Sequence, residues 1–275
     1  MTDDATSRSP GGQPPPGIDD TVPQSARIWN YWLGGKDNYP VDREVADRFR
    51  EVYPPIVDIA RAQRYFLARA VRFLAGEVGI RQFLDIGTGL PTVDNTHEIA
   101  QRVAPESRIV YVDHDPLVLT HARALLTSRA EGVTDYVDAD LRDPGVVLAG
   151  AERTLDFSRP IAISMLGILG HITDYDQARS IVRRLLDAVP SGSHLVIADG
   201  TNQFGGKVYD DAMRIWNASA EPPYLLRTPE QIAGFFEGLE LVEPGVVSVP
   251  LWRPDPSPFE PSAEVDNFGG VGRKP

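Results

Sequence analysis

Apolar and polar positions alternate with two different periods along most of the chain. In residues 55–76 the apolar side chains recur at helical spacing, and Gly76 supplies a stop signal. The apolar face of this predicted helix consists of Ile59, Phe66, Leu67, Ala70, Val71 and Leu74. Beyond it, short apolar runs predict strands at 81–87, 107–115, 133–141, 159–169 and 193–200. Helical patterns between the strands lie at 92–104, 116–130 and 174–189.

This alternation predicts an α/β fold with a doubly wound, mostly parallel sheet and helices on both faces. Short strands made almost entirely of apolar residues fit burial on both sides of such a sheet. Residues 239–252 contain two further β-rich runs around Pro244 and Gly245. We expect these runs to form an antiparallel hairpin that closes one edge of the sheet.

Composition divides the chain into four expected segments. Residues 1–20 are acidic and rich in proline and glycine, so they predict a disordered tail. Residues 21–76 predict a helical N-terminal lid and cap, and residues 77–254 predict the ligand-binding core. Residues 255–275 are rich in proline and are expected to be irregular.

Charge and residue usage exclude several classes of function. The net charge of -12 argues against binding to nucleic acid or to anionic membranes, which need basic patches. The chain has no cysteine, which removes disulfides and thiolate metal sites. No apolar run approaches the roughly 20 residues that span a bilayer, and the N-terminus lacks the features of a signal peptide. We therefore expect a cytoplasmic protein without a membrane partner.

The chemically promising residues follow the predicted strands, where open α/β sheets bind their ligands. The candidate positions are Asp85 with Gly87 and Gly89, Asp113 to Asp115, Asp140 with Leu141, residues 164–171, and Asp199 with Gly200. Glycines in the first group permit positive φ angles and let a ligand touch backbone N–H groups. A plain tight turn explains the same two glycines about equally well.

The glycine loop differs from the dinucleotide-binding fingerprint. That fingerprint has a third glycine three residues after the second one, and this position is Thr92. The third glycine allows a close approach to a pyrophosphate. Its absence weighs against a nicotinamide dinucleotide as the ligand.

The next two strand ends carry residues suited to a nucleoside. Asp113 is placed to accept the hydroxyls of a ribose, and Asp140 to accept a hydrogen bond from the amino group of adenine. Leu141 is expected to contact the adenine ring through its backbone. His114 lies either beside the base or in an exposed loop. Together with the glycine loop, these positions indicate a nucleoside-binding crevice without pyrophosphate features.

The sequence resembles an actinobacterial group of S-adenosyl methyltransferases, long labelled a domain of unknown function, within the class I S-adenosylmethionine-dependent methyltransferases. The resemblance covers residues 25–254 and is carried by 26–49, 81–92, 109–126, 138–144 and 237–254. It implies a Rossmann-like class I fold, S-adenosylmethionine as cofactor and methyl transfer as the reaction, but no particular acceptor. One departure is Gln63-Arg64, where the family pattern has Asn-Arg.

The resemblance also implies roles for individual residues. Asp85, Gly87 and Gly89 would hold the methionine end of the cofactor, and Asp113 would bind the ribose hydroxyls. The adenine would lie between Asp140 and Leu141.

The segment 26–42 combines aromatic residues, two adjacent glycines, a lysine and an asparagine. One interpretation is a lid that hinges at the glycines and turns Tyr31, Lys36 and Asn38 toward cofactor or substrate. The alternative is an aromatic-rich helix that packs on the sheet. Arg64 and Arg27 are candidates for binding a carboxylate.

His171 follows the fourth predicted strand and is the preferred general base for an acceptor that must lose a proton. The alternative for His171 is a structural hydrogen bond. The histidines show no paired spacing that indicates a metal site. The sequence thus predicts a methyltransferase acting on a small-molecule acceptor. A nicotinamide-dinucleotide oxidoreductase and an S-adenosylmethionine-binding protein without transferase activity remain as alternatives.

Overall fold

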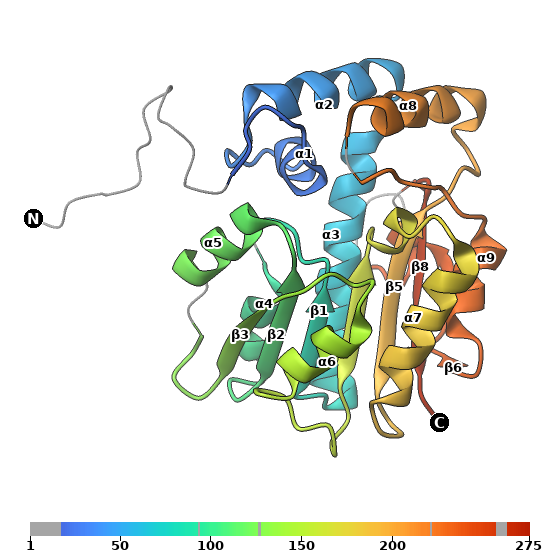
Figure 1. The fold of residues 1–275 in the computed structure, drawn as a ribbon. Helices are drawn as coiled ribbons and strands as arrows, with labels where there is room; N and C mark the ends of the chain where they lie inside the picture. Colours follow the sequence, from blue (N-terminus) through green and yellow to red (C-terminus); the bar gives the residue numbers. More distant parts are fainter. Residues whose placement is uncertain (1–17, 93, 126–127, 221, 257–262) are drawn as a thin grey trace, which may run out of the picture.

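The computed structural model describes residues 18–92, 94–125, 128–220, 222–256 and 263–275 (Figure 1). Its centre is a sheet with the strand order β3-β2-β1-β4-β5-β8-β6, and β7 pairs with β8 beside this path. The strands are β1 (Gln82–Ile86), β2 (Arg108–Asp113), β3 (Val133–Asp138), β4 (Ala162–Leu166), β5 (His194–Gly200), β6 (Glu240–Leu241), β7 (Val247–Ser248) and β8 (Asn267–Arg273). Strands β1 to β5 are parallel. The predicted doubly wound, mostly parallel α/β fold is confirmed.

Helices cover both faces of the sheet (Figure 1). Helices α3 (Ile56–Phe73) and α4 (Thr96–Val103) pack on one face, and α6 (Pro144–Ala151), α7 (Tyr175–Asp187) and α9 (Pro229–Ala233) on the other. Helix α5 (Pro116–Leu125) follows β2 and contacts β3. Along β1 the side chains alternate: Phe83 belongs to the cluster under α3 and α4, and Leu84 to the cluster under α6 and α7. Burial on both faces explains why these strands are almost continuously apolar.

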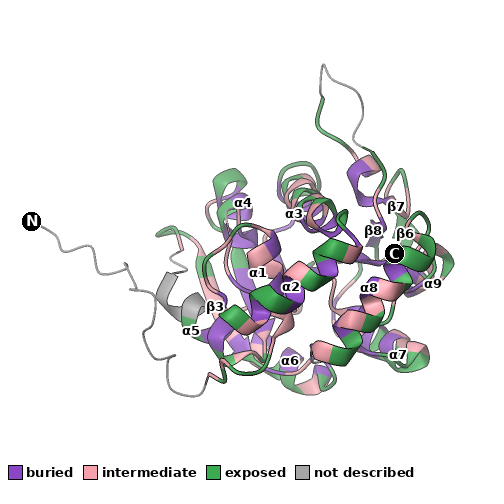
Figure 2. Ribbon diagram, turned by 90° about the horizontal axis from the view of Figure 1, so that it is seen from above, coloured by how far each residue is buried: buried purple, intermediate pink, exposed green. Residues whose placement is uncertain are grey.

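A helical cap lies over one end of the sheet (Figures 1 and 2). It consists of α1 (Ser25–Trp32), α2 (Pro40–Val52) and α8 (Gly206–Ser219), packed on the first part of α3. Aromatic rings join the three helices. The centroid of the Trp32 ring lies 5.3 Å from that of Phe49 and 5.8 Å from that of Trp216. The sequence indicated a cap only in residues 21–76, yet α8 completes it from the C-terminal half of the chain.

Residues 255–275 were expected to be irregular, and this is wrong for 267–273. Strand β8 pairs with β5 in antiparallel fashion along seven residue pairs, from His194–Arg273 to Gly200–Asn267. Its sequence hides the strand because Gly269, Gly270 and Gly272 interrupt the apolar alternation. The backbone needs a glycine at 269, where a Cβ would lie 2.5 Å from the carbonyl oxygen of Ile197. Residues 257–262 of the expected irregular segment lie outside the described residues.

The two β-rich runs around Pro244 and Gly245 form antiparallel pairs at this end of the sheet, as expected. Each run pairs with β8, however, and not with the other run. Short helices connect the larger elements: η1 (Leu74–Val78), η2 (Leu169–His171), η3 (Gly234–Phe236) and η4 (Val249–Leu251). Among the described residues, none of the helices has the length and apolarity to cross a bilayer. Of the expected disordered tail, residues 1–17 lie outside the described part of the chain.

Candidate active site

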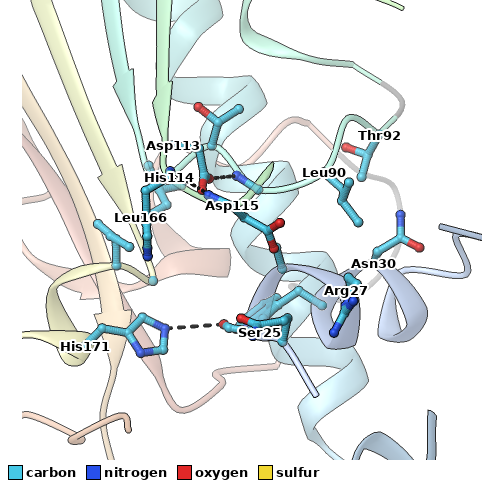
Figure 3. Close-up of a pocket in the computed structure, with 18 of the residues that line it drawn as sticks. Ser25, Arg27, Asn30, Leu90, Thr92, Asp113, His114, Asp115, Leu166 and His171 are labelled. Carbon is cyan, nitrogen blue, oxygen red and sulfur yellow. Dashed lines mark hydrogen bonds between the residues drawn. The ribbon is translucent and has the colours of Figure 1, made fainter. Parts of the chain in front are cut away.

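A cavity of about 390 Å³ opens at the carboxyl ends of β1, β2 and β4 and is roofed by α1 (Figure 3). Asp85, Asp113 and Leu166 line it from the ends of the three strands. The roof contributes Ser25 and Trp29 among others. This is the edge of an open α/β sheet at which ligands bind.

The glycine loop after β1 exposes its backbone to this cavity. Gly87 and Gly89 have φ angles of 72° and 66°, a region that favours glycine. A Cβ at Gly87 would lie 2.7 Å from the side chain of Ile168, whereas a Cβ at Gly89 would meet nothing within 4 Å. Gly87 is therefore required for packing as well as for its φ angle, and Gly89 leaves open space beside the cavity.

Asp85 lies one residue before the end of β1 and is almost completely buried, with 6% of its surface exposed. Its carboxylate accepts hydrogen bonds from the hydroxyls of Thr96, at 2.6 Å, and Ser164, at 2.8 Å. Burial raises the pKa of Asp85, although both hydroxyls and the charge of Arg64 act in the opposite direction. The result is a fixed carboxylate at the floor of the cavity.

Arg64 reaches the same region from α3 and lines the cavity. Its Nη2 donates to the carbonyl oxygen of Asp94 at 3.0 Å, and burial lowers its pKa while Asp85 and other acidic groups oppose this shift. None of the ion pairs among the described residues includes Arg64. Since a guanidinium carries five N–H donors, Arg64 has free donors for a ligand carboxylate.

Asp113 ends β2 with its carboxylate held by backbone donors (Figure 3). It accepts from the N–H groups of Gly89 at 2.9 Å, His114 at 2.8 Å and Asp115 at 3.0 Å. Burial raises the pKa of Asp113 more than these hydrogen bonds lower it. A carboxylate accepts about four hydrogen bonds, which leaves one acceptor position for a ligand hydroxyl. His114 is exposed and lines the rim of the cavity.

The structure does not bring Asp140 and Leu141 into the cavity lining. β3 ends at Asp138, and Asp140 turns back to accept from the N–H group of Arg142 at 2.8 Å and its Nε at 3.1 Å. Leu141 is 5% exposed and belongs to the core between the sheet, α6 and α7. The expected strand, 133–141, contained both residues, but β3 is shorter, and local hydrogen bonds and core packing hold their side chains elsewhere.

The residues expected on the lid, Tyr31, Lys36 and Asn38, do not line the cavity either. Tyr31 donates its hydroxyl hydrogen bond to Asp47 at 3.2 Å, and Lys36 is exposed. Asn38 is buried and donates to Oδ1 of Asn30 at 2.9 Å. The cavity is instead lined by another face of α1, formed by Ser25, Ala26, Trp29, Asn30 and Leu33.

The side chain of Asn30 holds the turn that contains the adjacent glycines Gly34 and Gly35. Oδ1 of Asn30 accepts from the N–H group of Asp37 at 3.0 Å, and a Cβ at Gly35 would overlap the Asn30 side chain. Gly34 has a φ of 82°. These contacts favour a rigid connection between α1 and α2, because opening a hinge here would break the hydrogen bonds of Asn30.

Arg27 serves the cap, because each of its three guanidinium nitrogens already has an acceptor within the protein. It is 1% exposed and pairs through Nε with Asp42 at 3.1 Å. Its other two nitrogens donate to the carbonyl oxygens of Asp19 and Val22. Arg27 thus ties residues 19–24 to the roof, and Ile18 packs against Leu90, Leu117 and Val118 beside the cavity.

His171 faces the cavity from η2, opposite Ser25 of α1 (Figure 3). Its Nδ1 lies 3.0 Å from the carbonyl oxygen of Pro223, and its Nε2 lies 3.3 Å from Oγ of Ser25. A carbonyl oxygen only accepts, so Nδ1 carries the proton and Nε2 of the neutral ring is an acceptor. Burial lowers the pKa of His171, which favours this neutral form.

Ser25 and Gln63 are among the lining residues that the sequence analysis did not name as ligand candidates. Ser25 lies four residues before Trp29 and eight before Leu33, so a helical wheel of the roof would have grouped them. Gln63 is 9% exposed, lines the cavity beside Arg64 and accepts from Nδ2 of Asn267 at 3.2 Å. No local pattern indicated this contact, because Asn267 belongs to strand β8, which the sequence analysis did not predict. Among the described residues, no group of three or more metal-ligating side chains is assembled.

Comparison with known proteins identifies the family. The model of the S-adenosyl methyltransferase family matches residues 11–275. The chain belongs to this family. No functionally curated protein matches it.

Solved structures extend this result. A DUF574 family protein from Streptomyces avermitilis is 47% identical, with 94% of this chain and 99% of that chain covered and a TM-score of 0.89. A candidate methyltransferase from Thermobifida fusca is 43% identical, with 95% and 98% covered and a TM-score of 0.86. The plantazolicin methyltransferase is similar in fold alone, at 11% identity over 91% and 96% of the two chains and a TM-score of 0.50.

The protein is therefore an S-adenosylmethionine-dependent methyltransferase with a class I fold, and its cofactor is S-adenosylmethionine. Nothing in the comparisons favours an oxidoreductase that uses a nicotinamide dinucleotide. This agrees with Thr92 in place of a third glycine.

Proposed function

We propose that this methyltransferase transfers the methyl group to a hydroxyl or amine of a small molecule, with His171 as the general base. The observation that carries the proposal is that Nε2 of His171 and the glycine loop of β1 open into the same cavity beneath α1. A base and a cofactor site on one cavity can act on the same acceptor atom.

The cavity residues fit the amino-acid end of S-adenosylmethionine. This end carries a carboxylate and an ammonium group. The free donors of Arg64 match the carboxylate, and the buried carboxylate of Asp85 matches the positive charge. Gly87 and Gly89 line the cavity wall, but their N–H groups donate to Val112 and Asp113 within the protein, so the expected ligand contact to these N–H groups is not assigned.

The nucleoside end fits the second strand. Asp113 retains one acceptor position for a ribose hydroxyl, and His114 lies next to it on the rim, where we place the adenine. We assign no contact to Asp140 or Leu141, since neither lines the cavity.

The bound cofactor supplies a methyl group that its sulfonium already activates. Catalysis then depends chiefly on holding the acceptor in line with the methyl group. His171 would accept the acceptor's proton at Nε2 as the acceptor takes the methyl group. In the present structure the hydroxyl of Ser25 occupies this position at Nε2 of His171. The roof formed by α1 and residues 18–24 restricts access of water.

A small acceptor agrees with the shape and charge of the site. The cavity, about 390 Å³ in volume and bordered by residues 18 and 19 and helix α1, has the size of a small-molecule site. The net charge of -12 gives no general attraction to nucleic acid.

Calorimetric titration with S-adenosylmethionine, S-adenosylhomocysteine and NAD⁺ tests the cofactor site. We expect binding of the first two; binding of NAD⁺ alone would contradict the proposal.

The acceptor is tested with a panel of phenols, alcohols and amines, with release of S-adenosylhomocysteine as the readout. His171→Ala should keep the cofactor affinity and lose turnover. Full turnover in this variant would remove His171 as the base, and no turnover with any panel member would favour a binding protein without transferase activity.

A further inference from the structure

The ring of Tyr224 supports His171 from outside the cavity lining. The two rings meet edge to face, with centroids 4.9 Å apart and an interplanar angle of 87°. Tyr224 is also wedged against two backbones: a Cβ at Gly170 would overlap its ring, and a Cβ at Gly200 would lie 3.2 Å from it. The position of Tyr224 is therefore set by η2 on one side and by the end of β5 on the other.

A buried charge pair anchors the Tyr224 hydroxyl. The hydroxyl donates to Asp199 at the end of β5 and accepts from the N–H group of Gly200 at 3.0 Å. Asp199 is 0% exposed and pairs with Arg227, which is 1% exposed, at 3.2 Å. Nη2 of Arg227 in turn donates to the carbonyl oxygen of Ile172, the residue after His171.

Backbone hydrogen bonds complete the connection. The N–H group of Leu225 donates to the carbonyl oxygen of Gly170 at 2.9 Å, and that of Arg227 donates to Gly200 at 3.0 Å. Residues 223–227 are thereby joined to both η2 and β5. The carbonyl oxygen of Pro223, which contacts Nδ1 of His171, lies at the beginning of this segment.

A buried ion pair is a poor means of stabilising a fold, because desolvation cancels most of the attraction. Its use here is better explained by what it orients. The pair holds Tyr224 and the backbone around Ile172, and these two elements flank His171.

We infer that Tyr224, anchored by Asp199 and Arg227, is a positioning residue that keeps the Pro223 carbonyl on Nδ1 of His171 and so keeps Nε2 unprotonated toward the cavity. The inference rests on the proposed role of His171 as the base. Free neutral imidazole of histidine favours the proton on Nε2, the wrong nitrogen for a base that faces the cavity. Holding the other tautomer therefore requires a fixed acceptor at Nδ1.

The tautomer and titration of His171 are measurable without an acceptor substrate. Long-range ¹H–¹⁵N spectra of the full chain labelled with [¹⁵N]histidine separate the two tautomers, and His171→Gln assigns the signals. In the wild-type protein we expect Nδ1 protonated and a low titration midpoint. Ser25 on α1 and Tyr224 contact the ring, and the charges of His114 after β2 and Arg142 after β3 contribute to lowering its pKa.

Tyr224→Phe keeps the ring but removes the hydroxyl that reaches Asp199. We expect the single tautomer to be lost, with signal from the Nε2-protonated form. Because the hydrogen bond to Pro223 raises the pKa of His171, its loss should also move the titration midpoint further down. Asp199→Asn, which removes the buried charge, should change the same signals. Tyr53→Phe is the matched control: the Tyr53 hydroxyl donates to buried Asp266 at 2.7 Å, but its ring stacks on Tyr209. This control should leave His171 unchanged.

The outcomes separate the two proposals. An Nε2-protonated His171 in the wild type would overturn both the base assignment and this inference. A wild type with Nδ1 protonated, together with unchanged His171 signals in Tyr224→Phe, would overturn only the inference. If Tyr224→Phe does not fold, unchanged signals in Asp199→Asn decide against it in the same way. Cofactor affinity, titrated in parallel, should stay within twofold of wild type in both variants.

Discussion

Oγ of Ser25 and Nε2 of His171 lie 3.3 Å apart and join elements separated by 146 residues. The contact links the roof helix α1 to the loop after β4 across the top of the cavity (Figure 3). Since Nδ1 of His171 donates to Pro223, Ser25 is the donor and Nε2 the acceptor. Under the proposed mechanism, an acceptor hydroxyl or amine would take the place of the Ser25 hydroxyl at Nε2 of His171.

Ser25→Ala should raise the pKa of His171. The Ser25 hydroxyl stabilises the neutral ring, and a hydrogen bond to the neutral form lowers the pKa of a histidine. Loss of a neutral hydrogen bond worth about 0.5–1.5 kcal/mol corresponds to a rise of up to roughly one pKa unit. Titration of the His171 signals by NMR measures the change. A midpoint that falls in Ser25→Ala would show that Ser25 does not donate to the ring.

Arg64→Met should weaken binding of S-adenosylmethionine by about 1.5–3 kcal/mol, the range for hydrogen bonds to a charged group. Calorimetry measures this loss. 5′-Methylthioadenosine lacks the amino-acid carboxylate and should bind wild type and variant equally well. Arg61→Met is the matched control, because Arg61 is exposed on the same helix. Equal losses for both ligands would place Arg64 away from the carboxylate.

Asp113→Ala should weaken S-adenosylmethionine by about 1–3 kcal/mol, because the ribose loses an acceptor that carries a charge. Here 5′-methylthioadenosine should lose as much, since it retains the ribose. Asp138 pairs in register with Asp113 on the neighbouring strand β3 and is exposed, so Asp138→Ala is the control. An unchanged affinity in Asp113→Ala would remove the ribose assignment.

The sequence predicted the part of the site that depends on strand order. Asp85, Gly87, Gly89 and Asp113 each follow an apolar run, and parallel strands deliver such positions to one edge of the sheet. The structure brings all four to one cavity. Both the local pattern and the topology were available from the chain, which is why this part could be predicted.

Contacts between distant segments could not be predicted from local patterns. His171 meets Pro223 across 52 residues, and Gln63 meets Asn267 across 204. Strand β8 carries glycines where a strand usually carries β-branched residues, so neither its position nor its contact with Gln63 had a local signal. Asp140 shows the opposite case: it was expected at the end of a strand, but β3 ends at Asp138 and Arg142 holds the Asp140 carboxylate in the following loop.

Asp85→Asn should stabilise the protein without cofactor, and by more at higher pH. Burial raises the pKa of Asp85 above its ordinary value of 3.8, so the folded chain holds this proton more tightly than the unfolded chain. Stability therefore falls as the pH rises from about 3.8 through the raised pKa and then levels off. Asparagine does not titrate and can still bond with the hydroxyls of Thr96 and Ser164. The variant's advantage in the free energy of unfolding should grow across this interval.

Urea denaturation of wild type and variant at several pH values between about 4 and 7.5 measures the difference in their free energies of unfolding. Titration of the groups that both proteins share cancels in this difference. Asp156→Asn supplies a control whose difference should stay nearly flat over this range. Asp156 is exposed, and hydrogen bonds from Ser158 lower its pKa from 3.8, so its contribution to stability is complete above the ordinary pKa and is lost only at lower pH. If the difference in the free energy of unfolding between Asp85→Asn and wild type stays flat or shrinks with rising pH, burial does not raise the pKa of Asp85. The Asp85→Asn variant should also bind S-adenosylmethionine more weakly, although it is more stable without cofactor. The buried charge that lowers the stability of the cofactor-free protein is the same charge that would face the cofactor's positive groups.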